Sequence, residues 1–160
     1  MNSIQISEYH EAHRQEIIDM VLNIQREEFG LPITIHDQPD LEDIAGFFQK
    51  RGNFWVATED GGVVGTIGLF DIGDGNAVLR KMFVKAAYRG KGVARDLLGV
   101  LLNWASRNGF RSVYLGTTPK YLAAHRFYEK NQFAEISRDE LPANFPVMEV
   151  DKKFYRYDIQ

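Results

Sequence analysis

The chain has 160 residues, of which 44% are apolar and 26% are charged, and its formal net charge is −3. These values are ordinary for a globular protein, and the length predicts one domain, residues 1–160, with a substantial core. The acidic net charge argues against a general nucleic-acid binder, and the absence of cysteine excludes disulfides and thiolate chemistry. The sequence predicts a cytoplasmic protein without a secretory leader or a membrane-spanning helix.

The N-terminal segment predicts a strand followed by a long helix. Ile4 and Ile6 alternate with polar residues, which is typical of a half-buried strand. Ser7 is in position to cap a helix with acidic residues in its first turn, and the apolar residues that follow repeat at helical spacing to about Phe29. Gly30 is expected to end this helix.

The stretch after this helix, residues 31–39, is apolar but has no period and contains two prolines. It is therefore predicted to be a loop whose Leu31, Ile33 and Ile35 are covered. Two interpretations stay open: these side chains pack on the body of the domain, or they form a lid or wall over a substrate pocket. A second helix is expected over residues 40–48.

Three antiparallel strands are predicted next, over residues 54–58, 63–70 and 77–84. The sequence Asp60-Gly61-Gly62 is typical of a tight hairpin turn between the first two of them. Gly65 and Gly68 lie inside the second strand, which indicates a bulge or the close approach of another group.

A basic loop with glycines follows the strand at 77–84 and leads into an amphipathic helix. From residue 84 to residue 95 the chain has two glycines, no acidic residue and four cations, Lys85, Arg89, Lys91 and Arg95. Glycines let backbone N–H groups converge on one point, and the start of a helix adds unpaired donors and a partial positive charge. The loop therefore predicts a phosphate or pyrophosphate site, although it fits neither the nucleoside-triphosphate nor the dinucleotide glycine motif.

The second half of the chain predicts a parallel crossover and two further strands. The amphipathic helix leads to a strand at 111–116, which should lie parallel to the strand at 77–84. Another helix is expected to begin with Thr118 as N-cap and Pro119 as its first residue. Strands near 133–136 and within 147–157 complete the pattern, which predicts an α/β fold with a mixed sheet.

Two segments resemble the motifs of the GCN5-related N-acetyltransferase (GNAT) superfamily. Arg89, Gly92 and Ala94 fit its acetyl-CoA signature, [QR]-x-x-G-x-[GA]. Residues 124–133 fit its second motif, A-x-x-x-Y-x-x-x-G-F, except that Gln132 stands where the family usually has glycine. With the predicted order of elements, the resemblance covers nearly the whole chain.

The resemblance implies a GNAT-like fold, a mixed sheet of about seven strands flanked by four helices in the order β-α-α-β-β-β-α-β-α-β-β. It also implies that an acetyl group passes from acetyl-CoA to an amine by direct attack, and that a bulge in the central strand makes room for the pantetheine arm. Tyr121 is a departure, because relatives often carry an asparagine there that binds the pantetheine.

Site residues follow from the same resemblance. Tyr128 matches the family's general acid, which protonates the departing thiolate; its alternative role is to anchor the short helix by packing. No metal site is expected. The residues expected to bind acetyl-CoA are Met82, Phe83, Val84, Arg89, Gly90, Lys91, Gly92, Val93, Ala94 and Arg95.

The general base is not identified by the sequence, because Val78 stands where many relatives carry a glutamate. Arg80 and Lys81 are neighbours on a strand and should point to opposite sides, so that one of them can face the acceptor and suit a carboxylate. A relay of water is one alternative for the base, and the candidate side chains are Glu28, His36, Asp37 and Asp71.

The resemblance thus implies an acyltransferase that acts on the primary amine of a small molecule, such as an amino acid or a polyamine. Two alternatives stay open: an acetyltransferase for a protein lysine or N-terminus, and a non-catalytic acyl-CoA-binding module. The binding module stays open because Val78 stands in place of the usual glutamate. The presence of Tyr128, at the position of the family's general acid, argues against it. The expected partner is a small-molecule amine, with neither nucleic acid nor membrane. The oligomeric state stays open, and a homodimer is one alternative.

Overall fold

The computed structural model describes residues 3–159. Within them the main elements are β1 (Ile4–Glu8), α1 (Arg14–Leu22), α2 (Pro39–Glu42), β2 (Gly52–Glu59), β3 (Gly62–Gly73), β4 (Asn76–Val84), α3 (Val93–Arg107), β5 (Ser112–Thr117), α4 (Leu122–Lys130), β6 (Ala134–Ile136) and β7 (Lys153–Asp158). The strands form a mixed seven-stranded sheet in the order β1-β2-β3-β4-β5-β7-β6. The predicted α/β class is confirmed.

The chain divides into two compact units, and β4 contributes to both of them. The first unit consists of Met1–Phe70 and Arg80–Asn103, and the second of Asp71–Leu79 and Trp104–Gln160. Between residues 3 and 159, no helix has both the length and the apolar character needed to span a bilayer.

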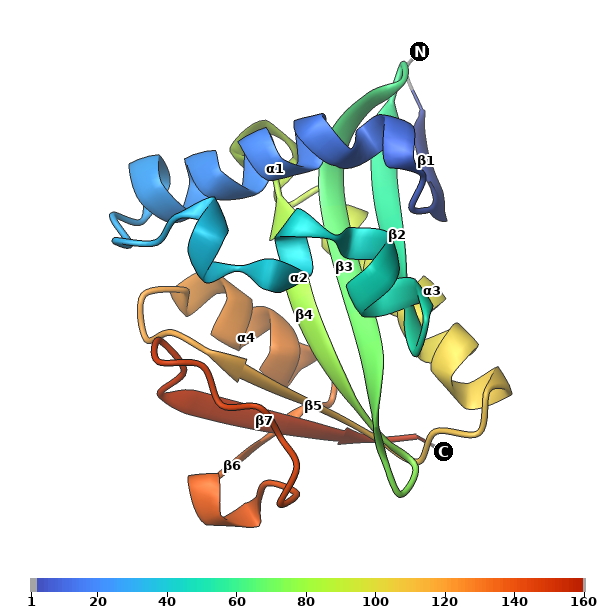
Figure 1. Cartoon of the computed structure of the whole chain (residues 1–160), viewed down its shortest axis with the longest axis vertical. Helices are drawn as coiled ribbons and strands as arrows, with labels where there is room; N and C mark the ends of the chain where they lie inside the picture. The colour runs from blue at the N-terminus through green and yellow to red at the C-terminus, as the bar shows by residue number, and fades with distance from the viewer. Residues whose placement is uncertain (1–2, 160) are drawn as a thin grey trace. The chain divides into compact units, whose positions relative to one another are not determined.

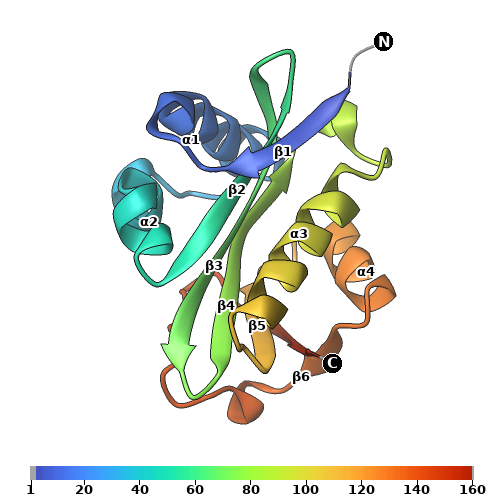
Figure 2. The ribbon, with the colours of Figure 1, turned by 90° about the vertical axis from the view of Figure 1, so that its right-hand side faces the viewer.

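In the first unit, helices cover both faces of an antiparallel part of the sheet. β1 pairs with β2, placing Ile4 opposite Glu59, and β2 pairs in turn with β3. The predicted hairpin turn is confirmed, because Asp60 and Gly61 both have a positive φ, 51° and 82°. α1 and α2 lie on one face of these strands and α3 lies on the other (Figure 1 and Figure 2).

Close packing on both faces explains the glycines inside β3. A Cβ atom at Gly68 would lie 2.7 Å from the Phe48 ring and 2.8 Å from the Phe54 ring. On the other face, a Cβ atom at Gly65 would lie 3.1 Å from the Leu97 side chain of α3. The predicted close approach is therefore confirmed at both positions.

The first helix begins later than predicted, and Ser7 is not its N-cap. Ser7 lies in β1, opposite Val56. The extended backbone continues because the Tyr9 N–H donates to the Phe54 carbonyl at 2.7 Å, and the Tyr9 ring packs edge-on against the Phe54 ring at 5.8 Å. Helical structure starts only at Glu11. Pairing with a distant strand thus outweighs the local capping signal.

Both N-terminal helices contain irregular turns. α1 continues into a π-helical turn over Asn23–Glu28, and Gly30 follows with φ 65°, so the predicted end is confirmed. The second helix is not continuous over residues 40–48 as predicted, because it is divided into α2 and a π-helical turn over Ala45–Gln49. The interruption lies at Asp43, whose side chain accepts the Gly46 N–H at 3.0 Å and competes with helical hydrogen bonding.

In the second unit, β5 pairs with β4 on one side and with β7 on the other. The β4–β5 ladder is parallel, as predicted, and runs from Asn76 opposite Ser112 to Val78 opposite Tyr114. β7 is antiparallel to both β5 and β6. The crossover through α3 therefore connects two neighbouring parallel strands, which pair through the first residues of each.

The last helix, α4, also starts later than predicted, at Leu122. Thr118 and Pro119 belong to the turn before it, where the Thr118 hydroxyl accepts the Lys120 N–H at 3.4 Å. The Thr118 carbonyl is 2.9 Å from Nε2 of His125, which is buried. Thr118 therefore stabilises the turn and the first part of the helix without capping it.

Candidate active site

The basic loop predicted to bind a phosphate joins β4 to α3 in the first unit. After a short 3-10 turn over Ala86–Tyr88, Gly90 and Gly92 have positive φ values of 75° and 88°. α3 begins at Val93, so the first turn of the helix presents N–H groups that have no partner within the helix. Residues 82–84, the other expected contacts of acetyl-CoA, end β4 directly before this loop.

The cations of this loop are not equivalent. The Arg89 guanidinium forms a bidentate ion pair with Glu28 at the end of the first helix, and its Nε donates to the Val84 carbonyl at 2.9 Å. Lys91 is exposed, and the Arg95 side chain is 73% exposed. Arg89 therefore joins the loop to the first helix. Lys91 and Arg95 are exposed, and Nε of Arg95 lies 3.7 Å from the exposed Asp96 carboxylate.

Three of the four candidate bases contribute to local structure, and the fourth, His36, is exposed. Glu28 is held by Arg89, and Asp71 accepts the backbone N–H two residues later at 2.7 Å. Asp37 accepts hydrogen bonds from the backbone and the hydroxyl of Thr34, at 2.9 and 3.0 Å, which lower the pKa of its carboxyl group. His36 is 85% exposed. None of the four is marked as a base by its surroundings.

A buried carboxylate to which the sequence did not point lies beside β4. Asp40 on α2 is 2% exposed, and its Oδ2 lies 3.1 Å from Nζ of Lys81 and 3.5 Å from Nη1 of Arg80. Its Oδ1 is buried and has no hydrogen-bond partner among residues 3–159. Buried ion clusters are costly to build, so this one suggests a role beyond stability. An acidic residue in the first turn of a helix is common, which is why no sequence signal distinguishes Asp40.

Arg80 and Lys81 lie on the same side of β4, so the prediction that they point to opposite sides is wrong. The alternation of the strand breaks at Lys81, which has a positive φ of 56°. The Lys81 carbonyl accepts a hydrogen bond from the Thr66 hydroxyl at 2.7 Å, which holds this backbone in place. A strand residue in this conformation acts as a β-bulge, and the bulge lets two consecutive side chains reach Asp40.

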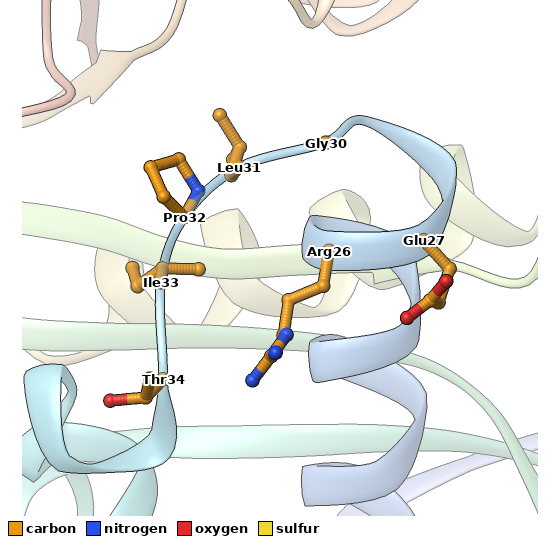
Figure 3. Close-up of a pocket in the computed structure, with 7 residues that line it drawn as sticks. All are labelled: Arg26, Glu27, Gly30, Leu31, Pro32, Ile33 and Thr34. Carbon is orange, nitrogen blue, oxygen red and sulfur yellow. The ribbon is translucent and has the colours of Figure 1, made fainter.

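The apolar loop after the first helix is partly packed and partly open. Leu31 is buried, whereas Ile33 and Ile35 are half-buried. Figure 3 shows a hollow between this loop and the end of the first helix. Its volume is about 430 Å³, and it is lined by Arg26, Glu27, Gly30, Leu31, Pro32, Ile33 and Thr34. Packing therefore accounts for Leu31, and a lid or wall formed by the other side chains stays a prediction.

Two buried amides anchor this loop to the first helix. Gln25 and Gln38 exchange hydrogen bonds in both directions, at 3.0 and 2.9 Å, and they are 5% and 0% exposed. Nε2 of Gln38 also donates to the Thr34 carbonyl at 3.3 Å. The pair closes the loop at its base, because residues 25 and 38 flank it on either side.

Replacing Gln38 with leucine is expected to lower the free energy of unfolding by about 1–3 kcal/mol, because the buried Gln25 amide loses its partner. The double variant Gln25→Leu/Gln38→Leu should recover part of this loss, since both polar groups are then removed together. Urea unfolding of the two single variants and the double variant measures the coupling. Strictly additive losses would contradict the assignment of this pair as the anchor of the loop.

In the second unit, Tyr128 is buried on α4. Its ring centroid lies 5.4 Å from that of Phe133 and 5.8 Å from that of Tyr155. Its hydroxyl makes no hydrogen bond with any of the residues described. Burial, and to a lesser extent the neighbouring Tyr121 and Tyr155, raise the pKa of Tyr128, so the phenol keeps its proton at neutral pH. A general acid must be in this protonated state.

The second motif ends in a strained turn. Gln132, which stands in the place of the family's usual glycine, has φ 74°, a region where residues with a Cβ atom are strained. The Phe133 N–H nevertheless donates to the Tyr128 carbonyl at 3.0 Å. The turn expected of the motif is therefore formed without glycine.

Comparisons with known proteins agree with these features. The sequence model of the acetyltransferase (GNAT) family matches residues 18–133. N-acetylaspartate synthetase of Xenopus tropicalis is 39% identical over 100 residues, which are 61% of this chain and 37% of that protein. The chain thus matches little more than a third of the length of this curated relative.

Two solved structures are similar over nearly the full length of the chain. A GNAT-family acetyltransferase from Staphylococcus aureus Mu50 is 37% identical with a TM-score of 0.96, covering 99% of this chain and 100% of that one. An acetyltransferase from Streptococcus agalactiae 2603 is 34% identical with a TM-score of 0.91, covering 97% and 98%. With the family motifs in the loop before α3 and on α4, these matches show that the chain belongs to the GNAT family of acetyltransferases.

Proposed function

We propose that residues 1–160 act as one N-acetyltransferase domain that transfers the acetyl group of acetyl-CoA to the primary amine of a small molecule carrying a carboxylate. The amine nitrogen attacks the thioester carbonyl directly, so that a C–N bond forms and the C–S bond breaks. The amine gives up a proton, and the departing thiolate gains one.

The donor is held by the end of β4 and the loop that follows it. Left-handed glycines at 90 and 92 allow the backbone to approach a pyrophosphate, and the N-terminus of α3 adds N–H donors and partial positive charge. Lys91 and Arg95 contribute full charges. The backbone of Met82 and Val84 pairs with the amides of the pantetheine arm in the manner of an added strand.

Tyr128 supplies the proton for the departing thiolate. The hydroxyl makes no hydrogen bond within the described part of the chain, and burial keeps it protonated. The tetrahedral intermediate carries an oxyanion, which is stabilised by a backbone N–H of the central strand. We assign no side chain as the base, and water carries the proton of the amine to solvent.

The observation that carries the choice of acceptor is the pairing of Arg80 and Lys81 on one side of β4. Both cations are largely buried, at 15% and 9% side-chain exposure, and the bulge at Lys81 brings them to a shared carboxylate, Asp40. Adjacent cations with fixed geometry suit an anionic group on the acceptor, and guanidinium in particular binds carboxylates bidentately. An α-amino acid offers an amine and a carboxylate in one small molecule. The relative named N-acetylaspartate synthetase supports this class of acceptor.

The proposal is tested by following thiol release from acetyl-CoA with α-amino acids and with the matching amines that lack the carboxylate. We expect the amino acids to have the higher kcat/KM. The variant Arg80→Gln should raise KM for an amino acid about 10- to 100-fold, the loss of one charge-assisted pair, with little change for the matching amine. Binding of acetyl-CoA, measured by calorimetry, should stay the same.

The alternatives predict other outcomes. Equal rates with amino acids and simple amines would show that the protein does not recognise a carboxylate on the acceptor, and this part of the proposal would fail. A preference for peptides with a free N-terminus or a lysine would support a protein acetyltransferase. Acetyl-CoA binding without transfer to any amine would support a binding module.

A further inference from the structure

A third cation, Arg51, lies close to Arg80, and it has no ion pair among the residues that the structure describes. Arg51 follows the π-helical turn after α2, is exposed, and makes no hydrogen bond or ion pair with any residue from 3 to 159. Its guanidinium carbon lies 4.9 Å from the centre of the Phe47 ring and 4.7 Å from the centre of the Phe70 ring. Both phenyl rings thus hold a charged group that has no counterion within this part of the chain.

The same two rings also hold Arg80. Its guanidinium carbon lies 5.7 Å from the centre of the Phe47 ring and 5.0 Å from the centre of the Phe70 ring. Because both guanidinium carbons lie within 5.0 Å of the Phe70 centre, they are separated by at most twice that distance. The two rings are themselves in edge-on contact at 5.0 Å. Arg51 and Arg80 therefore form a pair of guanidinium groups on one aromatic support.

We propose that Arg51 binds a second carboxylate of the acceptor, so that the preferred acceptor is a dicarboxylic amino acid such as aspartate or glutamate. In this arrangement Arg80 and Lys81 bind one carboxylate and Arg51 binds the other. The inference rests on the proposed function, since it concerns the acceptor of the same reaction. It adds a residue that determines specificity and the chemical class of the acceptor's side chain.

The chemistry of arginine supports this role. A guanidinium packed against an aromatic face keeps its N–H groups at the edge of its plane, where they can form two parallel hydrogen bonds to a carboxylate. The rings also restrict the rotation of the long side chain, so less conformational freedom is lost when the anion binds. A neutral amide such as that of asparagine carries no charge, and its NH2 group stands in place of one of the two acceptor oxygens that a guanidinium fork binds in a carboxylate.

The test compares aspartate with asparagine, and glutamate with glutamine, as acceptors of nearly equal shape. We expect the protein to acetylate each acid with a higher kcat/KM than its amide. The variant Arg51→Gln should lower kcat/KM for the acids about 10- to 100-fold and for the amides less than about threefold. Arg51→Lys keeps the positive charge but lacks the two parallel N–H donors of the guanidinium group. It should therefore lower kcat/KM for the acids less than Arg51→Gln does.

Lys50→Gln is the matched control, because it removes the same charge from the adjacent exposed position, whose ammonium group makes no cation–π contact with the two described rings. It should leave the ratio between acid and amide as it is. Circular dichroism and calorimetric binding of acetyl-CoA check that each variant is folded and binds the donor.

Failure of this inference is distinguishable from failure of the proposed function. If no amino acid is acetylated although acetyl-CoA binds, the proposed function itself is overturned. If amino acids are acetylated but aspartate and asparagine react equally well, or Arg51→Gln lowers both rates to the same extent, the dicarboxylic specificity is overturned and the function stands. A loss of the acid preference in Lys50→Gln would point to general electrostatic attraction and would also overturn the role of Arg51.

Discussion

Replacing Gly92 with glutamate is expected to weaken acetyl-CoA binding by more than about two orders of magnitude. The residue lies directly before α3, where the proposed binding mode brings the backbone close to the pyrophosphate. A Cβ atom there would lie 3.0 Å from a guanidinium nitrogen of Arg95, and the added carboxylate would both compete for this cation and repel the phosphates. Isothermal calorimetry with CoA and with acetyl-CoA measures the effect.

The control for this variant must match its backbone strain as well as its charge. Gly92 has φ 88°, so any side chain there carries a cost of roughly 1–2 kcal/mol in addition to its effect on the ligand. Gly61 in the β2–β3 hairpin turn has a similar φ of 82°, and a Cβ atom added there would have no neighbouring atom within 4 Å. Gly61→Glu should therefore lose comparable stability and keep its affinity for CoA. If Gly92→Glu binds CoA as tightly as this control, the loop is not the pyrophosphate site.

The part of the site that could be predicted is the part coded by a continuous stretch of sequence. The strand before residue 84, the glycines of the loop and the amphipathic helix from Val93 are adjacent in the chain, and each element has a strong local signal. The hairpin at Asp60 and Gly61 was predictable for the same reason, because few dipeptides favour a turn of this kind.

The features that were missed depend on residues far apart in sequence. Ser7 has the chemistry of an N-cap, but pairing of β1 with β2 extends the backbone there. Lys81 gives no local sign of a positive φ, because the bulge is set by packing and by the Thr66 hydroxyl. The role of Asp40 depends on this bulge, since without it only one of the two cations could reach the carboxylate. Sequence periodicity alone therefore could not find the cluster of Asp40, Arg80 and Lys81.

Changing Tyr128 to phenylalanine is expected to lower kcat by roughly two orders of magnitude while the Kd of acetyl-CoA stays nearly constant. General acid–base assistance contributes typically ~10²–10⁴-fold, and a thiolate leaves tolerably well unaided, so the lower end is expected. The hydroxyl makes no hydrogen bond to the described residues, and the ring contacts with Phe133 and Tyr155 survive in the variant. The melting temperature should therefore change little. Steady-state kinetics and direct binding separate the effect on the transition state from any effect on the ground state.

The pH profile adds an independent test of the same role. Because the pKa of Tyr128 is raised above its ordinary value of 10.0, the phenol stays protonated as the pH rises to that value. The wild-type kcat should therefore show no loss from ionisation of this group below about pH 10. If the wild-type kcat declines below about pH 10 and this decline is absent in Tyr128→Phe, the raised pKa of Tyr128 is contradicted.

Tyr155→Phe provides the matched control in the same aromatic cluster. The Tyr155 hydroxyl donates to Glu129 at 2.6 Å, so its removal should cost stability, about 0.5–1.5 kcal/mol, and leave kcat nearly as it was. The catalytic assignment predicts opposite patterns for the two tyrosines: Tyr128 affects turnover without stability, and Tyr155 affects stability without turnover. If Tyr128→Phe lowers the melting temperature and acetyl-CoA binding together, with kcat following them, Tyr128 is a packing residue and water protonates the thiolate.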